Sequence, residues 1–145
     1  MPNATRPDAV DLTKAESYRL WTPVPIRFFD TDAMGHVSNI AYAAYLEVAR
    51  FQVFDRIFGA EPDPSSSAIL ARLTLDYRQE VNFPGDLDVG SCVIKIGTKS
   101  FELGHGIFRN GACVATASTI MVSFNYNIRQ SVPISDAVRQ ALLAV

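Results

Sequence analysis

The sequence predicts an α+β fold in which one long helix lies across an antiparallel sheet, and three observations lead to it. The stretch from Ser38 to Gly59 has the length and the apolar content of a single helix. From Ala68 onward, apolar and polar residues alternate with the period of two that is typical of strands. Short turn sequences join these strands, and connections of hairpin length make neighbouring strands antiparallel. The lone helix must then cover one face of the sheet.

The chain of 145 residues is predicted to form one domain over residues 21–145, preceded by an N-terminal arm over residues 1–20. Its hydrophobic content of 48% and charged content of 19% are typical of a soluble globular protein. A formal net charge of −2 provides no basic surface for nucleic acid. No apolar run approaches the roughly 20 residues that span a bilayer, so no membrane partner is expected. The polar N-terminus lacks a signal-peptide pattern, which favours a cytoplasmic location.

The first part of the domain is expected to be a strand followed by a loop. In the segment WTPVPIRFF, residues 21–29, the two prolines disfavour a helix and favour an edge strand. The segment DTDAMGHV, residues 30–37, is expected to be a loop, because Gly35 allows backbone conformations that other residues avoid.

The long helix is expected to begin after Ser38, a good N-cap, and to end before Gly59, a common C-terminal stop. Its first half, from Ile40 to Leu46, is apolar or aromatic on every face. Polar residues are confined to its second half, where Glu47 and Arg50 lie one turn apart and are close enough to pair. A helix with such a first half is expected to be wrapped by the rest of the protein.

Four strands and a short closing helix are expected to complete the domain. The expected strands are Ala68 to Tyr77, Leu87 to Thr98, Ser100 to Arg109 and Ala112 to Tyr126. The NFPGD segment, residues 82–86, is a turn signal, and Asn110-Gly111 is a strong hairpin signal. Ser135 is the expected cap of the closing helix.

Three chemically versatile side chains in these strands are expected to be structural. Cys92 and Cys113 lie in apolar, strand-like stretches, where a cysteine behaves as a small hydrophobic residue. They match no zinc-binding spacing, and a reducing compartment disfavours a disulfide between them. His105 is in phase with the apolar Leu103 and Ile107, which predicts a buried or interface histidine.

Asp30, Asp32 and His36 lie just ahead of the long helix, and this grouping is the main candidate for a functional site. Aspartates at such positions commonly cap backbone N–H groups and complement the helix dipole. A metal site is an alternative, but no fourth ligand lies nearby. In a catalytic interpretation, unpaired N–H groups at the helix start polarise a carbonyl oxygen. A carboxylate then attacks the carbonyl carbon or activates water, and Gly35 lets the loop approach the ligand.

The stretch RFFDTDAMGHVSNIAYAAYLEVAR, residues 27–50, resembles the signature of the hotdog-fold acyl-CoA thioesterases of the 4-hydroxybenzoyl-CoA thioesterase type. The resemblance continues in LTLDYRQEVNFPGDLDV, GTKSFELGHGIFRNG and NIRQSVPISDAVRQAL, and it covers residues 22–142. It implies the hotdog fold, an antiparallel sheet wrapped around one long central helix. It further implies a thioester hydrolase that releases a carboxylic acid and coenzyme A. The coenzyme is part of the substrate, so no separate cofactor and no metal are implied.

The resemblance also implies roles for the residues around the helix start. Asp32 falls on the position of the nucleophile or general base, and the backbone N–H near Asn39 falls on the group that polarises the thioester carbonyl. Asp30 is expected to hold the loop by accepting backbone hydrogen bonds. His36 is expected to orient the loop or the thioester end of the substrate. Many relatives have two asparagines after the G-H-V motif, whereas this chain has Ser38-Asn39.

Further substrate contacts are expected from Gly35, Tyr42, Tyr45, Thr98, Lys99 and Ser100. The two tyrosines line either the acyl pocket or the core. Lys99 is the expected contact for the phosphates of coenzyme A, with Arg72 and Arg78 as weaker alternatives. Glu47 is a reserve catalytic residue, because some hotdog enzymes use a carboxylate from the helix.

The resemblance implies a homodimer or homotetramer with an active site shared between subunits. The expected substrate is an acyl-CoA, and a thioester of acyl carrier protein is a close variant. A non-catalytic acyl-CoA-binding module, acting as a sensor or scaffold, is the alternative from another class of function. Hotdog dehydratases need a histidine and a carboxylate arranged to remove a proton from carbon, and the loop around Asp32 does not match that arrangement.

Overall fold

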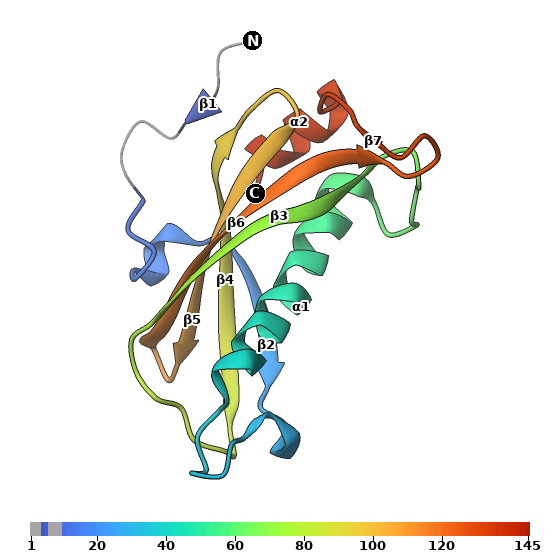
Figure 1. Ribbon diagram of the computed structural model, residues 1–145. Coiled ribbons are helices and arrows are strands. Elements are labelled where there is room, and N and C mark those ends of the chain that lie inside the picture. The colour runs from blue at the N-terminus through green and yellow to red at the C-terminus, as the bar shows by residue number, and fades with distance from the viewer. Residues whose placement is uncertain (1–3, 6–9) are drawn as a thin grey trace.

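A computed structural model describes residues 4–5 and 10–145 of the chain. Figure 1 shows a long helix, α1, crossing an extended sheet, with a second helix, α2, at one end. In chain order the elements are β1 Ala4–Thr5, η1 Ala15–Ser17, β2 Leu20–Pro25, η2 Phe28–Asp30, α1 Asn39–Phe58, β3 Ser67–Tyr77, β4 Asp86–Ile96, β5 Ser100–Arg109, β6 Ala112–Asn125, β7 Gln130–Ser131 and α2 Asp136–Leu143.

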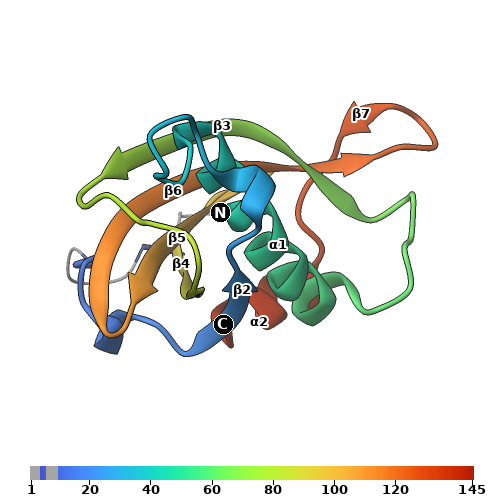
Figure 2. The same ribbon diagram turned by 90° about the horizontal axis from the view of Figure 1, so that it is seen from below.

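The strands form one antiparallel sheet in the order β1-β4-β5-β6-β3, with β2 also pairing with β4 and β7 with β6. Figure 2, turned by 90° from the view of Figure 1, shows that the sheet curls around α1. This arrangement confirms the predicted α+β class and the hotdog fold. The very short β1 and β7 were not predicted, because two residues carry no detectable hydrophobic period.

Both ends of α1 are where the sequence places them. The Ser38 hydroxyl accepts the N–H of Ile40, and Gly59, with a φ of 86°, ends the helix. The sheet wraps this helix as predicted, but in a single copy it does so on one side only. Ile40 is 78% exposed and Phe51 is 56% exposed, because the sheet covers only one side of α1. An apolar stripe therefore remains uncovered along the helix.

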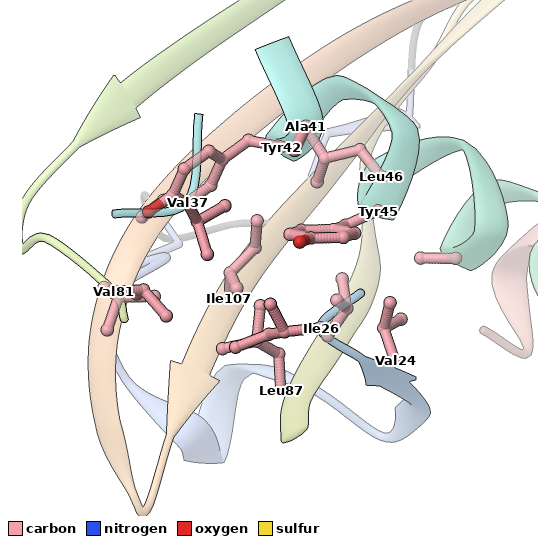
Figure 3. Close-up of a cluster of buried hydrophobic side chains, with 14 of the residues drawn as sticks. Val24, Ile26, Val37, Ala41, Tyr42, Tyr45, Leu46, Val81, Leu87 and Ile107 are labelled. Atoms are coloured by element: carbon pink, nitrogen blue, oxygen red, sulfur yellow. The ribbon is translucent and has the colours of Figure 1, made fainter. Parts of the chain in front are cut away.

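The half of the core nearest the start of α1 is built around aromatic side chains of that helix. Figure 3 shows Tyr42 and Tyr45 among aliphatic side chains from the sheet and the loops, including Val37, Leu87 and Ile107. All five are buried. Burying this much apolar surface anchors α1 firmly, so the loop that precedes it has a fixed base.

The outer face of the sheet is partly covered by residues that the sequence assigns to the N-terminal arm. Tyr18 packs in an apolar cluster with Cys92 and Phe108, and its ring approaches Gly90 so closely that a Cβ there would lie 2.4 Å from Tyr18 Cγ. Cys113 packs against the same cluster. Both cysteines thus lie in apolar surroundings, as expected for structural residues.

His105 is fully buried between the sheet and α1, which confirms its structural assignment. Its Nδ1 lies 3.0 Å from the Ser91 hydroxyl oxygen and its Nε2 lies 3.4 Å from the Thr119 hydroxyl oxygen. Burial, helped by the nearby positive charge of Arg50, lowers the pKa of His105 to about 3. The imidazole is therefore neutral at physiological pH.

Candidate active site

Asp30 is the anchor of the loop that precedes α1. Its carboxylate accepts hydrogen bonds from the Arg27 backbone N–H at 2.8 Å, from the Arg27 guanidinium at 2.8 and 3.1 Å, and from the Tyr45 hydroxyl at 2.8 Å. Burial by itself would raise the pKa of Asp30, but these hydrogen bonds outweigh it and hold the pKa below its usual value. The Asp30 carbonyl also accepts the Ser38 N–H at 2.7 Å. The expected role of Asp30 in holding the loop is confirmed.

Asp32 lies in the tight turn that follows. Its Oδ1 accepts the backbone N–H groups of Met34 at 2.9 Å and of His36 at 3.2 Å. Gly35, with a φ of 81°, provides the left-handed backbone that this turn requires. Asp32 Oδ2 has no hydrogen-bond partner among residues 10–145. One carboxylate oxygen therefore holds the turn, and the other remains available to a ligand.

A pocket of about 420 Å³ opens where this loop meets the start of α1 and the end of β3. Its lining residues are Asp32, His36, Val37, Asn39, Tyr42, Tyr77, Arg78, Gln79 and Glu80. Tyr42 thus belongs both to the core and to the pocket wall. Tyr45 and Gly35 are not among these lining residues: Tyr45 is a core residue committed to Asp30, and Gly35 shapes the turn.

Asn39 is the first residue of α1, where backbone N–H groups have no partner inside the helix. Ser38 satisfies the next two donors, because its hydroxyl accepts Ile40 N–H at 3.4 Å and its carbonyl accepts Ala41 N–H at 2.9 Å. Within the described chain, the Asn39 N–H has no acceptor. It remains a donor beside the Asp32 pocket, as the sequence prediction requires.

The second wall of the pocket comes from the end of β3 and the segment after it, where the sequence predicted a role for Arg78 but none for Tyr77 or Glu80. The Tyr77 hydroxyl donates to the Asn39 carbonyl at 2.7 Å. Glu80 Oε2 lies 3.1 Å from His36 Nδ1. The only sequence signal for these two residues was their place in the stretch LTLDYRQEV that carries the family resemblance.

The turn after this segment is clamped to the sheet and to the loop. Arg109 of β5 donates to the carbonyls of Asn82 at 2.5 Å and of Pro84 at 2.7 Å. Asn82 forms a backbone bridge with His36, and Val37 donates its N–H to the carbonyl of Val81 at 2.7 Å. The guanidinium of Arg109 thereby holds the turn, and the turn supports the loop that carries Asp32.

Several predicted site residues lie away from this pocket. Thr98 and Lys99 lie in the turn between β4 and β5, and Ser100 begins β5, at the end of the sheet opposite to the start of α1 (Figure 1). The carbonyl of Thr98 accepts the N–H of Ile134 at 2.9 Å. A single copy therefore cannot bring this turn to Asp32. Arg72 lies exposed on β3, whereas Arg78 is in the pocket wall.

Glu47 and Arg50 form no ion pair in the described chain, although their spacing allows one. Glu47 is exposed on α1 and does not line the pocket. Arg50 is 8% exposed, and its buried Nη1 has no hydrogen-bond partner. Burial lowers the pKa of Arg50. Although the two side chains are one turn apart, Glu47 is in water and Arg50 is buried.

The metal alternative finds no geometric support in the described residues. No group of three histidine, cysteine, aspartate or glutamate side chains there is placed to hold a metal ion. Asp30 is already committed to Arg27 and Tyr45. In the same part of the chain, no helix is both long and apolar enough to cross a membrane.

Known proteins share this fold. A curated relative, the uncharacterized protein YsmA of Bacillus subtilis, is 23% identical over 88% of this chain and 87% of its own length. A predicted thioesterase from Bacillus stearothermophilus is 24% identical, covers 86% of this chain and 93% of its own, and superposes with a TM-score of 0.81.

A thioesterase from Thermus thermophilus, solved in complex with coenzyme A and zinc, is 27% identical. It covers 86% of this chain and 98% of its own, with a TM-score of 0.77. Residues 26–142 match the Thioesterase-like superfamily, a range that contains the loop, the whole of α1 and every other element of the pocket. The chain belongs to the Thioesterase-like superfamily.

Proposed function

We propose that this protein is an acyl-CoA thioesterase of the 4-hydroxybenzoyl-CoA thioesterase type, which hydrolyses its substrate to a carboxylic acid and coenzyme A. One observation carries the proposal: Asp32 and Asn39 line the same pocket, the first with an uncommitted carboxylate oxygen and the second with an uncommitted N–H. A base and an oxyanion donor in one pocket are the two groups that thioester hydrolysis needs.

The proposed reaction begins with the thioester carbonyl oxygen at the Asn39 N–H, which stabilises the negative charge that develops there. Asp32 Oδ2 then removes a proton from water, or attacks the carbonyl carbon directly as a nucleophile. In the general-base route, the water oxygen bonds to the carbonyl carbon and the C–S bond breaks. The hydrogen bonds to Oδ1 keep the carboxylate in place during these steps.

Membership of the Thioesterase-like superfamily supports this activity, and the coenzyme A complex of the Thermus thermophilus relative supports an acyl-CoA substrate. Coenzyme A is part of the substrate, so the proposed chemistry uses no separate cofactor. A thioester of acyl carrier protein remains a variant of the same proposal. The cytoplasmic location stays a prediction.

We also propose that the working form is a homodimer or a homotetramer. β3 lies at one edge of the sheet, and a strand edge that bears uncovered backbone groups favours pairing with another copy. Leu70 of β3 is 43% exposed, and Phe51 of the uncovered apolar stripe of α1 is 56% exposed. The predicted contact of Lys99 with coenzyme A requires such a second copy, since that turn lies far from Asp32 in its own chain.

The experiment is a thiol-release assay with short, long and aromatic acyl-CoAs, using the wild type, Asp32→Asn and the matched control Asp55→Asn. Asp55 is exposed in the last turns of α1, far from the pocket. We expect turnover by the wild type and the control, and a loss of about a hundredfold or more in Asp32→Asn. Tight acyl-CoA binding without hydrolysis by any of the three proteins would instead identify a non-catalytic acyl-CoA-binding module.

A further inference from the structure

The proposed reaction leaves one proton without a route. When Asp32 takes a proton from water and the C–S bond breaks, the leaving thiolate of coenzyme A has to be protonated, and the proton on Asp32 has to leave. We propose that His36 carries this proton from Asp32 to the departing sulfur, and that Glu80 orients its ring for the task. This inference rests on the proposed function and adds a catalytic residue and a positioning residue to it.

The ion pair between His36 and Glu80 supplies the orientation. Glu80 Oε2 lies 3.1 Å from His36 Nδ1, so the carboxylate accepts the Nδ1–H of the imidazole. In the neutral ring the proton then resides on Nδ1, and Nε2 is the atom that accepts another. No residue of the described chain bonds to Nε2. Nε2, which Glu80 does not contact, is therefore the ring nitrogen that can accept a proton and pass it on.

The position of His36 fits the route. Its own backbone N–H donates to Asp32 Oδ1 at 3.2 Å, so the two residues share one turn, and both line the 420 Å³ pocket. The backbone bridge from His36 to Asn82 fixes the chain on the other side. Besides Asp32 and Glu80, the other charged or titratable groups that line the pocket are Arg78, Tyr42 and Tyr77.

The steps balance without another reactant. Water loses a proton to Asp32 Oδ2 as its oxygen bonds to the carbonyl carbon, and the C–S bond breaks to leave a thiolate. His36 Nε2 takes the proton from Asp32, directly or through a water, and transfers it to the sulfur. Asp32 returns to the carboxylate and His36 to the neutral ring, so one thioester and one water give one carboxylic acid and one thiol.

The test compares two esters of the same acyl group, one with coenzyme A and one with 4-nitrothiophenol. The nitrothiophenolate is a much weaker base than the thiolate of coenzyme A, so it leaves without needing a proton. We expect His36→Asn to lower kcat about a hundredfold on the acyl-CoA and less than about fivefold on the nitrothiophenyl ester. Glu80→Gln should show the same selective pattern with a smaller loss, and Glu80→Asp should restore part of it.

Glu16→Gln, exposed on η1 and outside the pocket, is the matched control and should lose nothing on either ester. An equal loss on both esters in His36→Asn would overturn the inference, because a misfolded or displaced loop harms both substrates alike. Asp32→Asn separates this outcome from failure of the proposed function. It should lose activity on both esters, and full activity of that variant would overturn the role of Asp32 itself.

Discussion

The hydroxyl group of Tyr77 donates a 2.7 Å hydrogen bond to the carbonyl of Asn39. This contact joins the last residue of β3 to the first residue of α1. The Tyr77 ring also packs edge-on against Tyr42, with ring centres 5.0 Å apart. The sheet thereby sets the orientation of the first helical turn, which carries the proposed oxyanion donor.

Removing that hydrogen bond should affect catalysis more than binding. In Tyr77→Phe the ring still packs on Tyr42, but the Asn39 peptide loses its tether to β3. A net hydrogen bond contributes about 1 kcal/mol, so kcat should fall about fivefold while KM changes little. Steady-state kinetics on an acyl-CoA checks this, with Tyr126→Phe as the control at an exposed tyrosine outside the pocket. A change confined to KM would contradict the proposed tether.

The clamp from Arg109 to the turn at residues 82–84 should stabilise the loop that carries Asp32. Arg109→Met keeps the aliphatic stem and removes both hydrogen bonds to the turn. We expect the free energy of unfolding to fall by about 1–3 kcal/mol and kcat/KM to fall as well. Hydrogen exchange at the Val37 N–H, which bonds to the carbonyl of Val81, should become faster.

Arg19→Met is the matched control for the clamp, because Arg19 is exposed and forms none of the hydrogen bonds or ion pairs found in the described chain. It should leave the exchange at Val37 unchanged. Unaltered exchange at Val37 in Arg109→Met would show that the loop does not depend on the clamp.

Buried His105 should make the protein less stable in mild acid. Its pKa is about 3 in the folded state against 6.5 for the unperturbed group, so between these values the unfolded chain binds a proton that the folded chain excludes. Its contribution to stability is complete above pH 6.5 and is lost as the pH falls toward 3. The free energy of unfolding should fall by about 1.4 kcal/mol for each pH unit in this range, which amounts to about 2 kcal/mol between pH 6.5 and pH 5.

Urea unfolding at pH 7.5, 6 and 5 measures this slope. The chain has two histidines, so His105→Gln and His36→Asn separate their contributions. The slope should flatten in His105→Gln and persist in His36→Asn. A slope that disappears with His36 and not with His105 would refute the assignment.

The uncovered stripe of α1 should be part of the contact between copies. Phe51→Glu places a charge on this stripe, and desolvating that charge at an apolar interface is costly. We expect the variant to sediment as a monomer and to lose activity, because the proposed site is shared. Leu143→Glu changes a residue of similar exposure on α2 and should stay oligomeric. Analytical ultracentrifugation compares the two, and an unaltered mass for Phe51→Glu would place the interface elsewhere.

Much of the architecture was predictable because its signals are local. The beginning of α1 depends on the Ser38 side chain and its end on Gly59, and both act within one helical turn. The turn around Asp32 likewise needs only its own backbone amides and Gly35. The alternation of the strands indicated which side chains face the helix, so His105 was correctly assigned to the interior.

Tertiary structure decided which side chains complete the pocket. Tyr77, Glu80 and Arg109 are separated by tens of residues from the groups that they contact, and only the pairing of β3, β5 and β6 brings them to the loop. The alternation of residues within one strand does not predict contacts between side chains so far apart in the sequence. The same holds for Arg50, which has the spacing to pair with Glu47 but is buried beside His105.

By itself, the sequence determined the local geometry at the start of the helix, because a cap, a tight turn and an unpaired N–H are properties of a few consecutive residues. It also indicated the superfamily, through a resemblance that covers residues 22–142. Only the tertiary structure decided that Glu80 faces His36 and that Tyr77 holds Asn39. Those contacts depend on how a curled sheet positions residues distant in the chain, and a linear pattern contains no such distances.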